Sequence, residues 1–269
     1  VAGAEAGRVM RGASGVALLA ASALAAGAIN AVAGGGSMLT FPALLAAGAT
    51  PLQANATSTV ALVPGSASAF WAYRRHLEGG GAFAAAMAVP SIVGGGLGTW
   101  LALRVGDSVF GRLVPWLILG ATALVALQSP LARWQLRRDP TEQPPGRGTL
   151  LAMAGFQCLV AVYGGFFGAG IGIMMLAALG LLGLRDIHRM NSLKNLAAVG
   201  INAVSMVLWI AAGRVRWPDA AVMALFAVLG GRLGADAARK VGPRVVRALV
   251  TGWGLLLAAV MLARQLRGP

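Results

Sequence analysis

Apolar runs long enough to cross the hydrocarbon core of a bilayer dominate this chain. A transmembrane helix needs about 20 consecutive, mainly apolar residues. Runs of this kind lie at roughly residues 13–33, 57–73, 82–103, 110–128, 149–167, 192–212, 218–236 and 245–263. Because only helices and closed barrels satisfy every backbone group in lipid, the runs predict an all-α integral membrane protein with about eight transmembrane helices.

The composition argues against a soluble protein. Hydrophobic residues make up 58% of the 269 positions and charged residues 11%, against about a quarter charged in a soluble domain. A net charge of +14 would suggest nucleic acid in a soluble protein, but the Lys and Arg residues fall in short gaps between apolar runs, as membrane-flanking charges do. We therefore expect the lipid bilayer, and not nucleic acid, as partner. Cys158 is the single cysteine and no metal-ligand pattern occurs, so neither metal nor cofactor is expected.

The two groups of four runs resemble two copies of one unit. Gly34 to Gly36 precede a short apolar piece in the first half, and Gly168 to Gly170 precede one in the second. Residues 94–98 match residues 230–234 in the same order. Such matches indicate internal duplication. The predicted division is a first membrane repeat at residues 1–128, a polar linker loop at 129–148 and a second membrane repeat at 149–269. Parallel and inverted repeats both stay open, with a slight preference for inversion.

The repeated glycine clusters are the strongest candidates for a binding site. The apolar pieces after them, residues 37–49 and 171–184, are too short for an untilted crossing and predict broken or re-entrant helices. In hydrocarbon an interrupted helix is tolerated only where protein or a polar cavity satisfies its backbone. A helix that begins after the break would direct unpaired N–H groups and the positive end of its dipole at an acceptor, and an anion is the natural one. The competing interpretation is that these glycines only permit close helix packing.

Uncharged polar side chains and one lysine accompany the breaks. Hydroxyl and amide donors suit oxyanions, although a single Ser or Thr more often bonds to its own helix. Lys194 lies just inside a predicted span, where an ammonium group either pairs with an anion or reaches back to the membrane interface. The predicted substrate-binding residues are Asn30, Gly34, Gly35, Gly36, Ser37, Asn55, Thr57, Ser58, Gly168, Gly170, Asn191, Ser192, Lys194 and Asn195.

The residues around the first break resemble the signature of a known family. Residues 28–42, followed by residues 54–58, are similar to the signature of the sulfite exporter TauE/SafE family of bacterial membrane permeases. Residues 168–172 and 230–234 fit the repeat of that family. The resemblance implies a multi-pass permease of the bacterial inner membrane for sulfur-containing anions such as sulfite, sulfoacetate or other organosulfonates. The second half departs from the pattern, since Ala169 stands between its glycines and no proline corresponds to that of the first half.

These features favour a transporter and argue against an enzyme. The chain has no P-loop of the Gly-x-x-x-x-Gly-Lys-Ser/Thr kind, so transport is expected to be passive or coupled to an ion gradient. It has no HExxH or GxSxG motif and no paired intramembrane carboxylates. We expect alternating access around a midplane site. Two alternatives stay open: a structural or partner-binding membrane protein, and a permease for other small anions such as carboxylates. Direction, coupling to protons or another ion, and assembly into a homo-oligomer also stay open.

Overall fold

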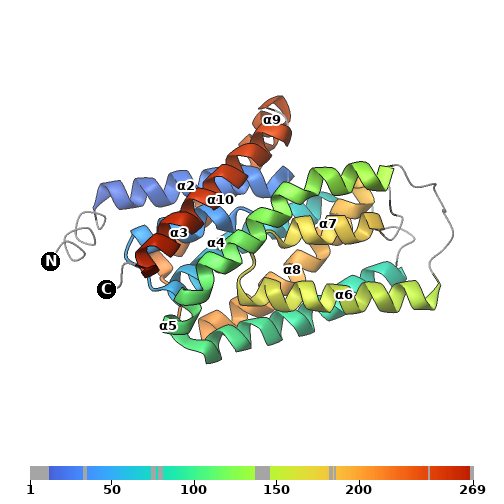
Figure 1. Cartoon of the computed structure of the whole chain (residues 1–269), viewed down its shortest axis with the longest axis horizontal. Helices are drawn as coiled ribbons and strands as arrows, with labels where there is room; N and C mark the ends of the chain where they lie inside the picture. The colour runs from blue at the N-terminus through green and yellow to red at the C-terminus, as the bar shows by residue number, and fades with distance from the viewer. Residues whose placement is uncertain are drawn as a thin grey trace.

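The structure is built from helices. The computed structural model describes residues 12–32, 35–73, 77, 81–136, 146–181, 184, 186–241 and 243–266, and no strand occurs among them. The helices, shown in Figure 1, are α2 (Ala13–Val32), α3 (Ser37–Ala46), α4 (Pro51–Tyr73), α5 (Gly81–Leu136), α6 (Arg147–Phe166), α7 (Ile171–Leu181), α8 (Ile187–Ala211), α9 (Trp217–Val241) and α10 (Pro243–Leu266). The predicted all-α class is confirmed.

The longest helix, α5, consists of two segments that meet at Gly106. This residue has φ 76° and ψ 167°, a conformation that glycine adopts without the steric cost of a side chain. The ribbon of α5 turns back on itself between its two segments (Figure 1). The two segments cover the runs predicted at residues 82–103 and 110–128, and the second continues to Leu136, into the stretch predicted as a linker.

The surface of the molecule suits a bilayer. Among the described residues, α2, α5, α6 and α8 are long and apolar enough to cross a membrane. Large apolar side chains such as Val93, Leu151 and Leu159 point outward, with 61%, 73% and 71% of their surface exposed. Water would disfavour so much exposed apolar surface, whereas lipid accommodates it. The predicted total of about eight spans goes beyond these four helices and stays a prediction.

Glycines bring pairs of helices into backbone contact. α2 packs along α9, and α6 packs along the first segment of α5. A side chain at Gly27 in α2 would collide with the carbonyl oxygen of Ala227 in α9. One at Gly98 in α5 would collide with the carbonyl oxygen of Val162 in α6. Small residues therefore let these helices approach as closely as their backbones permit, which is typical packing in membranes.

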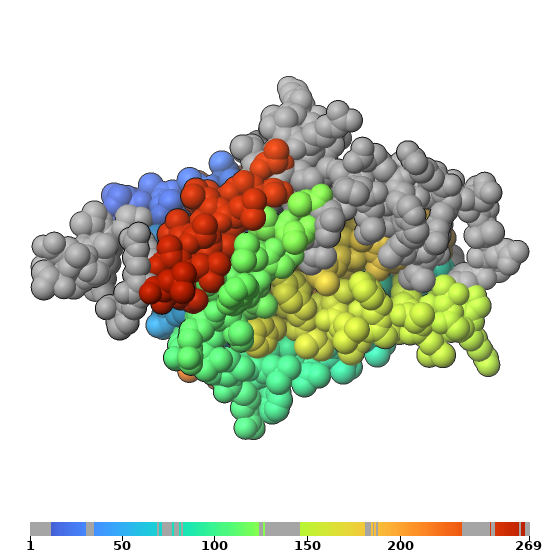
Figure 2. All heavy atoms as spheres, in the orientation of Figure 1, coloured from blue at the N-terminus to red at the C-terminus, as the bar shows by residue number. Residues whose placement is uncertain are grey.

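The same kind of contact occurs at matching places in the two halves. A side chain at Gly230 would collide with the carbonyl oxygen of Leu24, and one at Gly94 would lie 2.7 Å from that of Cys158. Gly94 and Gly230 correspond in the predicted duplication, and Leu24 and Cys158 each lie ten residues before a glycine cluster. A third pair of helices, α10 and the second segment of α5, lies side by side on the face of the molecule shown in Figure 2. In both contacts a glycine helix of one half packs against the first helix of the other half, and the duplication itself stays a prediction.

Candidate anion site

Both helix interruptions predicted at the glycine clusters are present. α2 ends at Val32 and α3 begins at Ser37, while α6 ends at Phe166 and α7 begins at Ile171. Each short helix packs against the long helix before it, and Figure 1 shows α7 running back along α6. The prediction of broken or re-entrant helices is confirmed.

Glycines form the turns in both breaks. Gly35 has φ 113°, and Gly168 and Gly170 each have φ 79°, a region that residues with side chains rarely adopt. Gly36 has an ordinary φ of −56°, but a side chain there would lie 2.6 Å from the carbonyl oxygen of Ala26 in α2. Gly34, also predicted as a site residue, lies outside the described residues.

The first break pairs the N–H groups of Gly36 and Met38 within itself. The N–H of Gly36 donates to Oδ1 of Asn30 at 2.8 Å. The N–H of Met38 donates to the carbonyl oxygen of Gly35 at 3.0 Å. The sequence predicted Asn30 as a substrate ligand and Gly36 as a donor to an anion, and here the two residues bond to each other. Ser37, at the start of α3, is half-buried.

The second break satisfies its carbonyl groups instead. Nδ2 of Asn55 in α4 donates to the carbonyl oxygen of Phe166, the last residue of α6, at 3.0 Å. The hydroxyl of Tyr163 donates to the carbonyl oxygen of Ala169 at 2.9 Å. Asn55, a predicted site residue of the first half, therefore lies at the break of the second half. Both bonds occupy acceptors that would repel an anion.

The amide groups of the second break have no such partners. Residues 169–172 are buried, and among the described residues their N–H groups have no hydrogen-bond partner. Gly164 lies six residues before Gly170, just as Asn30 lies six residues before Gly36. Because Gly164 has no side chain, no amide oxygen occupies the corresponding place. α7 therefore begins with buried N–H donors that have no acceptor among the described residues.

The predicted hydroxyl ligands of α4 are engaged within the protein. Oγ of Ser58 lies 2.6 Å from Oγ1 of Thr40 in α3, and both side chains are buried. Oγ1 of Thr57 accepts from the N–H of Arg216 at 3.0 Å. The structure thus joins Asn55, Thr57 and Ser58 to three different partners, of which two belong to the second half.

The predicted residues of α8 lie in a part of the helix that is enclosed by protein. Ser192, Lys194 and Asn195 are buried, and Asn191 is half-buried. Only 4% of Lys194 is exposed, far less than expected for a lysine whose ammonium group extends to the membrane interface. Among the described residues, the side chains of Lys194 and Asn195 form neither a hydrogen bond nor an ion pair. A buried ammonium without an acid beside it is costly, and a bound anion would offset that cost.

Comparison with known proteins identifies the family. The profile of the family described as "Sulfite exporter TauE/SafE" matches residues 19–261. The chain belongs to this family. The match covers both breaks and all the helices that carry predicted ligands. The sequence-based resemblance is therefore confirmed.

Relatives of this TauE/SafE member are named as membrane transporters. A "Probable membrane transporter protein" of Haemophilus influenzae is 29% identical over 88% of this chain and 90% of its own. "Probable membrane transporter protein ORF9" of Sinorhizobium sp is 28% identical over 92% of each chain. "Probable membrane transporter protein YfcA" of Escherichia coli is 28% identical over 91% of this chain and 87% of its own. No solved structure matches the chain significantly.

The family and the helices agree on the location of the protein. Apolar helices of spanning length and membrane-transporter relatives make this a multi-pass membrane protein. The bacterial inner membrane fits these relatives. The names of the family and its relatives are those of a transporter and not of an enzyme.

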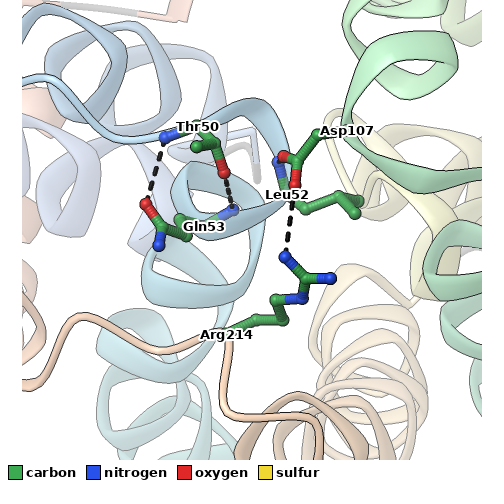
Figure 3. A network of polar contacts seen from close by, with 5 residues as sticks. All are labelled: Thr50, Leu52, Gln53, Asp107 and Arg214. Atoms are coloured by element: carbon green, nitrogen blue, oxygen red, sulfur yellow. Dashed lines mark hydrogen bonds and ion pairs between the residues drawn. The ribbon is translucent and has the colours of Figure 1, made fainter.

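Sequence reasoning missed a polar network at one end of the TauE/SafE fold. Asp107, directly after the turn at Gly106, accepts from the N–H of Leu52 at 2.9 Å and pairs with Arg214 at 3.2 Å (Figure 3). Thr50 and Gln53 bond to each other reciprocally at the start of α4, at 3.2 and 3.3 Å. In the sequence Arg214 is one basic residue among many at span ends. The available signal was Asp107, an acid beside a glycine between two apolar runs.

Proposed function

We propose that this TauE/SafE protein is a permease for small sulfur-containing anions such as sulfite, sulfoacetate or other organosulfonates, and that it works by alternating access. The observation that carries the proposal is the start of α7, where buried N–H groups of residues 169–172 have no acceptor among the described residues. In a medium of low dielectric constant such donors bind an anion strongly, because the positive end of the helix dipole adds to the hydrogen bonds.

The residues around this break have different roles in binding the anion. Asn55 and Tyr163 hold the carbonyl groups of Phe166 and Ala169, so that the anion meets donors and not acceptors. The oxygen of the anion would occupy the place that Oδ1 of Asn30 occupies at the first break. Lys194, buried in the same half, supplies positive charge. An oxyanion suits this arrangement because its several oxygens can each accept a bond.

Transport through such a site requires no nucleotide hydrolysis by this chain. The sequence carries no P-loop, so we expect passive movement or coupling to an ion gradient. Permeases built from repeats move one unit against the other around a fixed site. The interlocked helices α2 with α9 and α6 with α5 would be the bodies that move.

Two other functions compete with this proposal. A permease for carboxylates would use the same backbone donors, since a carboxylate is also an oxyanion. A structural or partner-binding protein would leave the unpaired N–H groups and the buried Lys194 without a role. The donors favour transport over a structural role, and the substrate panel below separates sulfonates from carboxylates.

The test is anion uptake into proteoliposomes that contain the purified protein. The panel holds sulfite, sulfoacetate, thiosulfate, sulfate and acetate, each with and without a pH gradient. We expect saturable flux of at least one sulfur anion, and a Gly155→Ala variant, in open space on α6, should retain it. Flux of acetate alone would identify carboxylates, and not sulfonates, as the substrates. Saturable flux of none of the five anions would contradict the proposal.

A further inference from the structure

The loop between α8 and α9, residues 212–216, is bonded to the first half at three places. The N–H of Arg216 donates to Oγ1 of Thr57, and its Nη1 donates to the carbonyl oxygen of Ala47 at 3.2 Å. Nη1 of Arg214 pairs with Oδ2 of Asp107 at 3.2 Å. We call these three contacts the clamp. They join a loop of the second half to the end of α3, to α4 and to the turn of α5.

The start of α4 is held by the same acid. Asp107 accepts from the N–H of Leu52 with one carboxylate oxygen and from Arg214 with the other (Figure 3). α8 begins differently, because its own Asp186 accepts from the N–H of His188 at 2.9 Å. A carboxylate at a helix N-terminus stabilises the helix in both cases. Only at α4 does the carboxylate come from another helix, so only there does the cap transmit movement between helices.

The clamp lies next to the candidate anion site. Thr57, its contact on α4, is two residues from Asn55, which bonds to the second break. One turn of α4 therefore contacts the loop through Thr57 and the second break through Asn55. Any displacement of the loop changes the surroundings of α4 where α4 contacts the site.

The ion pair of the clamp, between Arg214 and Asp107, is weak enough to open. The side chains of Arg214 and Asp107 are 41% and 32% exposed, and exposed ion pairs contribute little to stability because water screens them. Arg216 is also paired with Asp219 at 2.8 Å, which holds its guanidinium group in place. A contact that must break in every transport cycle has to be of low stability, as an exposed ion pair is.

We infer that the clamp is the closed gate at one end of the anion path, and that the path opens at that end when the loop at residues 212–216 separates from α3, α4 and α5. The inference rests on the proposed function, since a gate requires a path. It assigns a role to Asp107, Arg214 and Arg216, none of which belongs to the predicted site. Weakening the clamp should shift the population toward the state that is open at this end.

A cysteine placed below the clamp reports its opening. Ala61 is fully buried in α4, one helical turn beyond Thr57 on the same face. In a Cys158→Ala background, Ala61→Cys is the only thiol. Its rate of reaction with a membrane-impermeant maleimide is measured in right-side-out and inside-out vesicles, without substrate. The clamp variants are Arg214→Gln and Asp107→Asn. The matched control is Arg112→Gln, an exposed arginine whose side chain forms no clamp contact.

We expect Arg214→Gln and Asp107→Asn to raise the labelling rate severalfold from one side of the membrane only. Arg112→Gln should leave the rate unchanged, and Arg214→Lys, which keeps the charge, should restore most of the protection. Unchanged labelling in both clamp variants, with normal thermal stability in detergent, would overturn the gate. So would an equal rise from both sides, because that indicates general loosening. A one-sided rise in a protein that transports none of the panel would overturn the proposed function while keeping the clamp as the closure of that end.

Discussion

The two helix breaks look alike in the sequence and differ in their chemistry. In the first, Oδ1 of Asn30 accepts the N–H of Gly36 and the carbonyl oxygen of Gly35 accepts that of Met38, so two donors at the start of α3 are already paired. In the second, Asn55 and Tyr163 bond to carbonyl oxygens, and the N–H groups of residues 169–172 have no partner in the part of the chain that the structure describes. The repeated glycine turn therefore supplies the geometry of an anion site. The residue six positions before the last glycine, Asn30 or Gly164, decides whether a side chain of the protein already occupies that site.

The largest expected effect concerns bulk at the second break. Gly170 has φ 79°, so Gly170→Val forces a β-branched side chain into a left-handed conformation and displaces the N–H groups of α7. We expect anion flux to fall to background. Gly35→Val imposes similar strain at φ 113°, in open space, and should keep part of the flux because the first break already has its acceptor. The measurement is flux per inserted protein. Equal losses in the two variants would remove the distinction between the breaks.

The next effect concerns the buried charge of Lys194, in the half that contains the second break. Lys194→Gln removes the buried ammonium while keeping most of its volume. Since hydrogen bonds to charged groups contribute about 1.5–3 kcal/mol, the half-saturation concentration should rise roughly tenfold to a hundredfold. Arg189→Gln is the matched control on α8, because Arg189 lies over the ring of Phe83, 5.2 Å from its centroid, and has no predicted role in binding. Half-saturation that stays constant in Lys194→Gln would remove this residue from the site.

The sequence predicts helices and breaks well because both depend on local patterns. Apolar runs set the helices, and clusters such as Gly168 to Gly170 set the turns. The bonds that distinguish the two breaks depend on contacts across the fold. Asn55 and Phe166 are 111 residues apart, and Arg216 and Thr57 are 159 apart. No periodicity reports such pairings, so the sequence does not reveal that Thr57, a predicted ligand, bonds to the loop.

A smaller effect tests whether the carbonyl groups of the second break must be held. Tyr163→Phe removes the hydroxyl that donates to Ala169 and leaves a buried acceptor unpaired, at a cost of about 1–3 kcal/mol in stability. We expect a lower melting temperature and a severalfold rise in the half-saturation concentration of transport. Trp253→Phe removes a comparable donor, whose Nε1 lies 3.2 Å from the carbonyl oxygen of Met38 in α3. It should affect stability alone. A similar rise in half-saturation in both variants would show that neither carbonyl is specific to the site.

The smallest effect is expected for a hydroxyl at the first break. Ser37 begins α3, directly after the N–H that Asn30 already satisfies, so its hydroxyl is at most one donor among several. Ser37→Ala should therefore change the binding free energy by about 1 kcal/mol or less, which is a change of about fivefold or less in half-saturation. Asn30→Ala provides the contrast, because it leaves the N–H of Gly36 unpaired and should lower the melting temperature more than Ser37→Ala does. If Ser37→Ala reduces transport as strongly as Gly170→Val, the anion binds at the first break, and the distinction between a filled break and an open one is wrong.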